Sequence, residues 1–554
     1  MKTKIHSLAL MVVFGIYACH PKDDTSYPKI TPSEIDSNYL QPAYLTLHAI
    51  TGSNQPSNPI DVFQAQSFCT DECIYPYRGG EFYGSDYERF YRLFEHTWDA
   101  TFSESMTLWT IGFNSVDIAN REINSIKKFY PLSGYSSTEE YNKAISAPVA
   151  QLRLIRSLGY FYLIDFFGNV PIITDYDTTT ALASHYINNA DFNSGRKILF
   201  DTIVNNINTS IPYLSADFNA STFGTFHKWA AFALLAKMYI NAEEWTGTQK
   251  YDECIAACDS IINSGIFSLS EDYLSNFKQV NENSKENIFV IPYDENSTEL
   301  YEGFYLMSLH YNSYLKYQTV NEPWNGFCAL PDHYHSFDSN DVRKNGWSVG
   351  PQFAADNTTP LLLLKAPYTG KPLNFTPDFI DVNWSTAGIS GPYLGDTLTY
   401  RFCLENNGAR LVKYEIAKGL PHICQGVPLP LIRYADILMI KAEALMRKNG
   451  GAATSEAIDL VNQIRNRAGV TPYNNMNLTM DELLAERGRE FYYEGMRRQD
   501  LIRFGKFIGG NWGRNFSGPY QSQWYNRSDD GDFRKVFPIV IQESPPFFYQ
   551  NPGY

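Results

Sequence analysis

The stretch TMDELLAERGREFYYEGMRRQDLIRF, residues 479–504, decides the fold class because it carries the marks of a long helix. Thr479 and Glu482 form a capping box, in which each side chain satisfies a backbone N–H at the start of a helix. We expect the helix to run through Phe504. Two similar segments precede it in the chain, so this helix belongs to a larger helical scaffold.

Three carboxylates repeat through this stretch at intervals of four residues. Glu486, Glu490 and Glu494 would therefore share one stripe of the helix. Two of them could be the acid and base of a glycosidase, but such a pair must face each other across a substrate. We favour an ion-pair network that holds helices together. The candidate cations interleaved with the carboxylates are Arg487, Arg489, Arg497 and Arg498.

Further helices are predicted from apolar residues at three- and four-residue spacing. They cover residues 137–167, 228–242, 251–262, 433–447 and 457–468. Alanine-rich contact positions suggest pairs of close helices, so the chain is mainly α and is similar to a tetratricopeptide scaffold. Residues 281–430 show no helical period, and we expect long loops with short strands laid over the scaffold.

The first residues form an export signal. Lys2 and Lys4 precede the apolar run 8–17, and Ala18 and Cys19 end it. This ending resembles the bacterial lipobox, so we expect residues 1–18 to be a lipoprotein signal peptide and Cys19 to be acylated. An ordinary secretory signal is the alternative. We expect residues 19–40 to be a polar tether, and no later segment has the length of apolar residues that a membrane helix needs.

Composition narrows the function further. The chain of 554 residues is 44% hydrophobic and has a net charge of -15, which opposes binding to nucleic acid. Aromatic residues make up 15% of it, more than a core alone explains. There are 8 cysteines, and we expect the pairs at 69 and 73 and at 254 and 258 to be buried apolar residues rather than metal ligands.

No cofactor or metal is predicted. His333 and His335 lack a third histidine or cysteine nearby, and Asp338 and Asp341 lack the glycine and glutamate of a calcium loop. We interpret this segment as a capped turn. The sequence also has no glycine-rich phosphate loop and no nucleophile elbow.

Several motifs in a fixed order resemble the SusD/RagB family of outer-membrane glycan-binding lipoproteins. The motifs are TDE (70–72), RGGEFY (78–83), HTW (96–98), GYF (159–161), FGNVP (167–171), PWNG (323–326), GAR (408–410), KY (413–414), RYAD (433–436), ERGRE (486–490), EGMR (494–497), DL (500–501) and the ending QNPGY (550–554). The resemblance implies one SusD-like domain over residues 41–554. Its scaffold would cover about 100–270 and 430–505, and its ligand-binding loops about 50–100 and 281–430.

The resemblance also suggests where a glycan binds. Flat aromatic faces pack on sugar rings, and amides or charges hold the hydroxyls. The expected ligand-binding residues are Trp98, Tyr83, Trp324, Asn325, Tyr311, Asp71 and Arg78. Many family members carry tryptophan after the Arg-Gly pair, whereas this chain has Phe82 and Tyr83, so its specificity is expected to differ.

The expected function is capture of an oligosaccharide or polysaccharide without catalysis. The resemblance implies a lipid anchor in the outer face of the outer membrane and a SusC-like TonB-dependent transporter as partner. A surface lid for a transporter of peptides is one alternative, and a surface glycoside hydrolase is another.

Overall fold

The computed structural model describes eleven ranges of the chain. They are residues 35–52, 60–78, 87–130, 132–173, 192–294, 303–365, 368–378, 402–420, 425–509, 531–539 and 550–554. The predicted signal peptide and Cys19 lie outside them. The predicted tether is too long, because Asp36–Leu40 forms a π-helical turn and both Ile35 and Leu40 are buried in the core.

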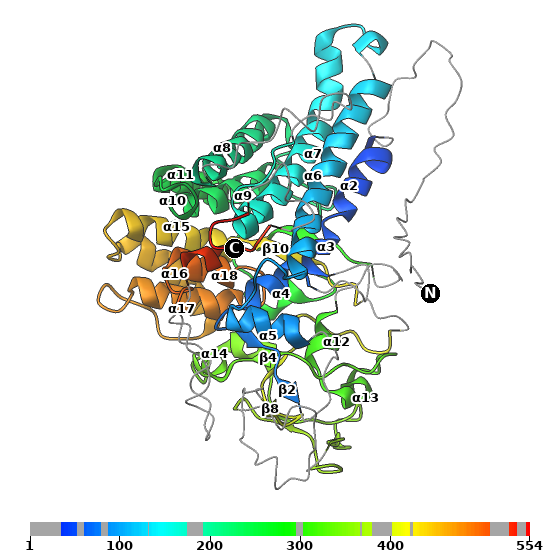
Figure 1. The fold of residues 1–554 in the computed structure, drawn as a ribbon, viewed down its shortest axis with the longest axis vertical. Coiled ribbons are helices and arrows are strands. Elements are labelled where there is room, and N and C mark those ends of the chain that lie inside the picture. Colours follow the sequence, from blue (N-terminus) through cyan, green and yellow to red (C-terminus); the bar gives the residue numbers. More distant parts are fainter. Residues whose placement is uncertain are drawn as a thin grey trace, which may run out of the picture.

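Helices dominate the described residues, as the sequence predicts (Figure 1). The α-helices are α2 (Gln41–Leu45), α3 (His48–Thr51), α4 (Val62–Ser67), α5 (Tyr87–Glu95), α6 (Glu104–Phe129), α7 (Thr138–Phe167), α8 (Phe192–Ser210), α9 (Lys228–Ile240), α10 (Ala242–Thr246), α11 (Tyr251–Ile262), α12 (Phe304–Ser308), α13 (Tyr314–Tyr317), α14 (Pro331–His335), α15 (Tyr434–Lys448), α16 (Ser455–Ala468), α17 (Met480–Phe491) and α18 (Arg497–Arg503). Pairs α6 and α7, α9 and α11, and α15 and α16 pack side by side, which is the tetratricopeptide-like arrangement. No helix in the described ranges has the length and hydropathy to span a bilayer.

Local signals set the ends of the long helices. The Ser137 hydroxyl accepts the N–H of Glu140 at the start of α7, and Gly168 ends that helix at φ 72°. Inside α7, Gly159 allows close packing, since a Cβ there would lie 2.6 Å from the carbonyl oxygen of Gly112 in α6. The hairpin of α6 and α7 is therefore packed backbone against backbone.

The prediction of one helix from 479 to 504 is wrong, although the Thr479 half of its capping box forms. Thr479 Oγ1 accepts the N–H of Glu482, but the helix ends at Phe491 and a new one, α18, begins at Arg497. Tyr493 takes φ 54° between them. Its carbonyl accepts the hydroxyl of Tyr414 at 2.8 Å, so a tertiary hydrogen bond replaces a helical one.

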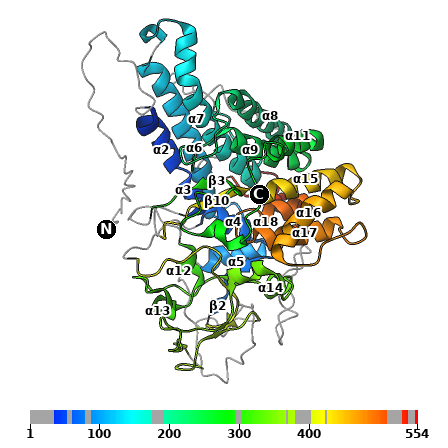
Figure 2. The ribbon, with the colours of Figure 1, turned by 180° about the vertical axis from the view of Figure 1, so that it is seen from behind.

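The loop-rich layer contains short strands. These are β1 (Cys73–Ile74), β2 (Tyr77–Arg78), β3 (Asn287–Ile291), β4 (Cys328–Ala329), β5 (Trp347–Ser348), β6 (Gly350–Pro351), β7 (Asn374–Phe375), β8 (Phe402–Cys403), β9 (Arg410–Leu411) and β10 (Leu429–Arg433). They pair in twos: β1 with β4, β5 with β9, β6 with β7 and β10 with β3 antiparallel, and β2 with β8 parallel. Figure 2 shows this layer below the helices, around α12 and α13.

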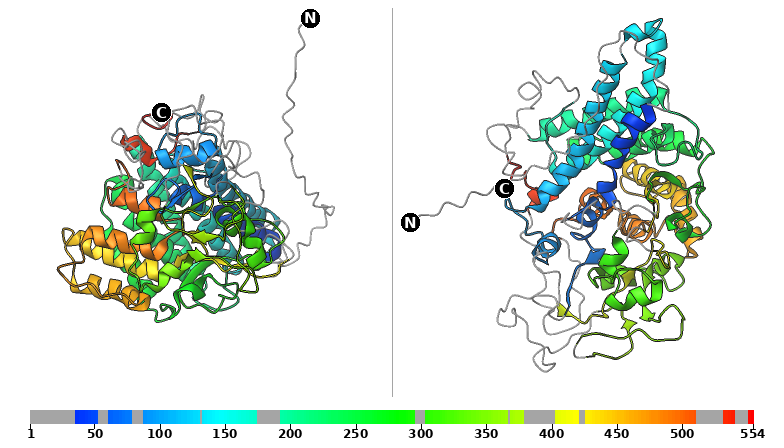
Figure 3. Two further views of the ribbon diagram at one scale, coloured as in Figure 1. Left: turned by 90° about the horizontal axis from the view of Figure 1, so that it is seen from below. Right: turned by 90° about the vertical axis from the view of Figure 1, so that its right-hand side faces the viewer.

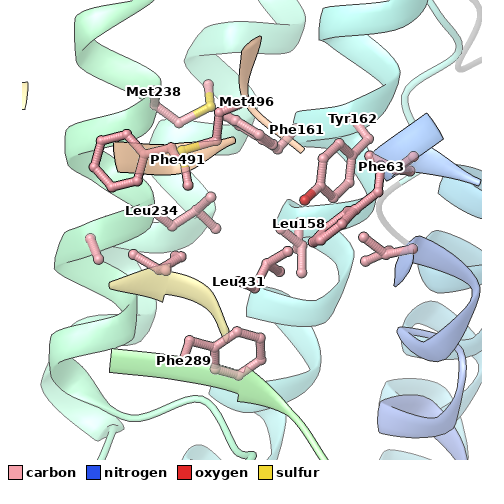
Figure 4. Packing of buried hydrophobic residues seen from close by; sticks show 14 of the residues in the cluster. Phe63, Leu158, Phe161, Tyr162, Leu234, Met238, Phe289, Leu431, Phe491 and Met496 are labelled. Carbon is pink, nitrogen blue, oxygen red and sulfur yellow. The ribbon is translucent and has the colours of Figure 1, made fainter. Parts of the chain in front are cut away.

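One continuous apolar cluster joins the two layers. In Figure 4, side chains of α4, α7 and α9 meet those of β3 and β10, with Leu431 of β10 between the helices and Phe289 of β3 below it. The pair β10 and β3 is buried at every position. The helical scaffold and the strand pair β3 and β10 therefore share one core, which holds the loops in place.

Candidate functional site

Trp324 lies on the loop layer with its backbone fixed. Its N–H donates to the carbonyl of Leu306 at 2.6 Å, and the N–H of Asn325 donates to the carbonyl of Leu309 at 2.7 Å. The indole is half-buried against an apolar cluster that contains Tyr305, Leu306 and Leu309. Trp324 thus presents part of its ring on a rigid support, as a sugar-stacking residue requires.

Asn325 serves this support rather than a ligand. Its side chain is buried, donates to the carbonyl of Glu405 at 3.0 Å and accepts Nη2 of Arg410 at 2.9 Å. Its backbone has φ 55°, a conformation that asparagine tolerates better than most residues. The expectation that Asn325 holds sugar hydroxyls does not fit these contacts.

Arg410 organises the loop beneath Trp324. The side chain is completely buried, and its guanidinium donates to the carbonyls of Asn407 at 2.6 Å, Gly408 at 3.0 Å and Glu405 at 2.8 Å, besides Asn325. Because a guanidinium presents several donors in one plane, it closes this turn in a way that lysine cannot.

Tyr311 lies close to the same support, two residues after Leu309. Its ring is half-buried, and Nζ of Lys365 lies 5.7 Å from the ring centroid. Glu405 fixes the lysine segment, because its Oε1 accepts the N–H of Leu364 at 2.5 Å and of Lys365 at 3.2 Å. The structure thus brings Tyr311 and Trp324 to one layer, with a cation beside the tyrosine.

A small pocket of about 10 Å³ borders the apolar cluster on which Trp324 packs, although Trp324 does not line it. Its lining shares Tyr305 and Ile416 with the apolar cluster on which Trp324 packs. The other lining residues are Phe304, Leu411, Tyr414, Glu415 and Gln425. Such a volume holds about one water molecule, so the pocket itself has no room for a sugar ring.

The backbone of Arg78 also belongs to this layer. Strand β2 pairs with β8, and Arg78 lies opposite Cys403, two residues before Glu405. The side chain of Arg78 and all of Tyr83 lie outside the described residues.

Two expected ligand residues lie elsewhere. Trp98 is 0% exposed, its Nε1 donates to the hydroxyl of Tyr554 at 2.6 Å, and Phe537 lies 4.9 Å away between ring centroids. Asp71 makes two 2.6 Å contacts with the guanidinium of Arg497. Trp98 has no free face for a sugar, because the carboxy-terminal residues of the chain cover it.

The glutamate network is confirmed as structural. Glu486, Glu490 and Glu494 have side chains with 0% exposure, and each carboxylate contacts at least two cations. Burial would raise the pKa of Glu490, but Arg467 and Arg433 outweigh it and lower the pKa to about 2. A carboxylate held charged and closed off from ligand has no route to acid–base catalysis.

The expected cation partners are mostly wrong. Only Arg489 of the interleaved arginines contacts the network, at 2.7 Å from Glu486. Arg487 pairs with Asp436 and Asp500, while Arg498 pairs with Asp165. The cations that complete the network come from distant segments and are Arg343, Lys413, Arg433, Arg465 and Arg467. Lys413 and Arg433 belong to the family motifs KY and RYAD, and this membership is the one feature of the sequence that could have pointed to them.

The expected capped turn forms at Asp341, whereas His333 and His335 lie in helix α14. Asp341 accepts the N–H of Arg343 at 3.0 Å. Burial lowers the pKa of His333 to about 3, whereas the exposed His335 lies 2.7 Å from Asp378. Across the described ranges, no group of three His, Cys, Asp or Glu residues is arranged to hold a metal ion.

The cysteine interpretation holds where the structure describes it. The four cysteines of the two predicted pairs, together with Cys328, are all buried.

Comparison with known proteins agrees with the architecture. A family model described as "SusD family" matches residues 407–554, and one described as "Starch-binding associating with outer membrane" matches residues 66–240. The starch-binding protein SusD of Bacteroides thetaiotaomicron is 26% identical over 446 residues, covering 73% of this chain and 72% of that protein. A SusD-like protein of Bacteroides ovatus is 23% identical, covering 72% of this chain and 65% of that protein.

Solved structures share the fold. The surface glycan-binding protein A of B. thetaiotaomicron, in complex with laminarihexaose, aligns with a TM-score of 0.67 at 19% identity, over 94% of this chain and 100% of that one. The helical scaffold with its loop layer thus defines a protein of the SusD fold. The chain is similar to the SusD/RagB family, whose models match residues 66–240 and 407–554.

Proposed function

We propose that this protein is a cell-surface lipoprotein that binds an oligosaccharide and passes it to a SusC-like TonB-dependent transporter. It acts without catalysis and is anchored in the outer membrane through acylated Cys19. The glycan class is supported by relatives that bind starch and laminarin oligosaccharides by their own descriptions. The anchor is supported by the signal that ends at Cys19.

One observation carries the binding part of the proposal. Trp324 is half-buried on a support whose hydrogen bonds are made by the buried residues Asn325 and Arg410. An aromatic ring that keeps a fixed orientation loses little entropy when a sugar stacks on it. Tyr311 adds a second ring from the same layer.

Affinity electrophoresis through gels that contain polysaccharides tests this proposal. The protein is the mature chain with Cys19→Ser, and the panel includes starch, laminarin and xyloglucan. Trp324→Ala should abolish retardation by the one glycan that slows the parent protein. Trp229→Ala is the matched control, because Trp229 is also half-buried but lies on helix α9 of the scaffold.

The outcomes separate the alternatives. Retardation that survives in Trp324→Ala keeps glycan binding but moves the site away from this residue. No retardation by any glycan, together with co-purification of the transporter, would favour the lid for peptide uptake. Release of reducing ends by the purified protein would instead favour a hydrolase.

A further inference from the structure

The hairpin of α6 and α7 reaches beyond the rest of the molecule, at the end opposite the loop layer (Figures 1 and 3). The last buried residue of α6 is Ile126, and the first buried residue of α7 is Ile145. The part between them, residues 127–144, is called here the hairpin end. Among its described residues, only Tyr141 and Ala144 pack against the main core, and they do so at its edge.

The hairpin end is nevertheless aromatic. Phe129 is 42% exposed, and Tyr130, Tyr135 and Tyr141 are half-buried. Tyr135 and Tyr141 lie edge to face with centroids 5.4 Å apart. Large rings at a projecting tip cost solubility unless they meet a partner.

Its charge differs from that of the whole protein. The hairpin end carries Lys127, Lys128 and Lys143 against Glu139 and Glu140, a net charge of +1 in a chain of net charge -15, and Lys127 and Lys128 are exposed. Nζ of Lys128 lies 5.5 Å from the ring centroid of Phe129. Rings combined with lysines are the composition that settles at the boundary between lipid headgroups and acyl chains.

The described chain begins beside this hairpin. Tyr39 lies edge to face with Tyr130, with 6.1 Å between their centroids, and helix α2 packs along α6 and α7. The residues between Cys19 and Ile35 span at most about 55 Å when fully extended. A lipid on Cys19 would therefore keep this side of the molecule within that distance of the bilayer.

We propose that the hairpin end is a membrane-contact surface, which inserts Phe129 at the headgroup boundary and places Lys127 and Lys128 against anionic groups. The inference rests on the lipid anchor in the proposed function. Contact at a second point would stop the protein from rotating freely about its tether and so set its orientation on the membrane.

A fluorescent probe tests this contact. The mature acylated protein carries Phe129→Cys labelled with the environment-sensitive dye NBD, in vesicles of phosphatidylethanolamine and phosphatidylglycerol. Met476→Cys is the matched control, because Met476 is 84% exposed on a loop of the helical scaffold between α16 and α17. Labelled parent protein corrects for background from native cysteines. The expected result is a blue shift at position 129 and none at 476, and loss of that shift when Lys127→Glu and Lys128→Glu are added.

Other outcomes overturn the proposal. An unshifted probe at 129 on protein that floats with the vesicles refutes the hairpin contact and leaves the anchor intact. Equal shifts at both positions mean that no specific face meets the lipid. A shift at 129 that requires the transporter assigns the surface to a protein partner instead. Protein that neither floats nor shifts loses both the anchor and the contact, while glycan retardation reports separately on binding.

Discussion

Nη1 of Arg433 lies 3.0 Å from Oε1 of Glu490, and neither side chain has any exposed surface. The arginine ends strand β10 and the glutamate lies in helix α17, 57 residues later. The contact therefore joins the sheet that underlies the loop layer to the helical scaffold. Lys413 adds a second link, because its Nζ lies 2.6 Å from Glu494.

Glu490→Gln should lower the free energy of unfolding by about 3 kcal/mol, because it removes a negative charge from between buried arginines. Urea unfolding followed by circular dichroism measures the change. Glu253→Gln is the control, since Glu253 is 44% exposed and pairs only with Lys250 on the surface. It should cost less than about 0.5 kcal/mol. Equal losses in the two variants would contradict a structural role for the network.

Glu72 should make stability fall as pH rises. Burial raises the pKa of this carboxyl from 4.5 to about 8 despite the nearby Arg497. Between these values the folded protein binds a proton that the unfolded chain releases, so the free energy of unfolding declines with pH. Urea unfolding at pH 5 and pH 8 should show this decline in the parent protein and a smaller one in Glu72→Gln. Identical slopes would show that the glutamate is ionised in the folded state.

Trp98→Phe should weaken the fold and leave glycan binding unchanged. The substitution removes the hydrogen bond to Tyr554 and part of a buried ring, at a cost of about 2 kcal/mol. Thermal unfolding and affinity electrophoresis on one preparation separate the two effects. If the variant folds but no longer binds the glycan, the prediction is wrong and Trp98 belongs to the ligand-binding site.

Arg410→Lys should weaken glycan binding by roughly tenfold, equivalent to about 1.4 kcal/mol. A lysine cannot reach the carbonyls of residues 405, 407 and 408 at once, so the support of Trp324 loosens. Isothermal titration measures the affinity. Arg503→Lys is the control, because Arg503 is also a buried arginine and pairs with Glu443 in the helical scaffold. Equal loss of affinity in both would mean that the effect comes from general destabilisation.

The sequence by itself determined the helical class and several helix ends. Ser137 and Thr479 cap the helices that follow them, and Gly469 ends α16 at φ 73°. These features depend on residues within one turn of each other, so local spacing is sufficient to predict them. The order of the motifs along the chain was sufficient to predict the resemblance to the SusD/RagB family.

Only the tertiary structure decided which groups meet. It interrupted the helix after Phe491, supplied Glu490 with Arg343, Arg433 and Arg467, and buried Trp98 while leaving part of Trp324 open. Each outcome depends on contacts between residues tens to hundreds of positions apart. A buried charge or ring takes its role from the partners that surround it, and local periodicity holds no information about them.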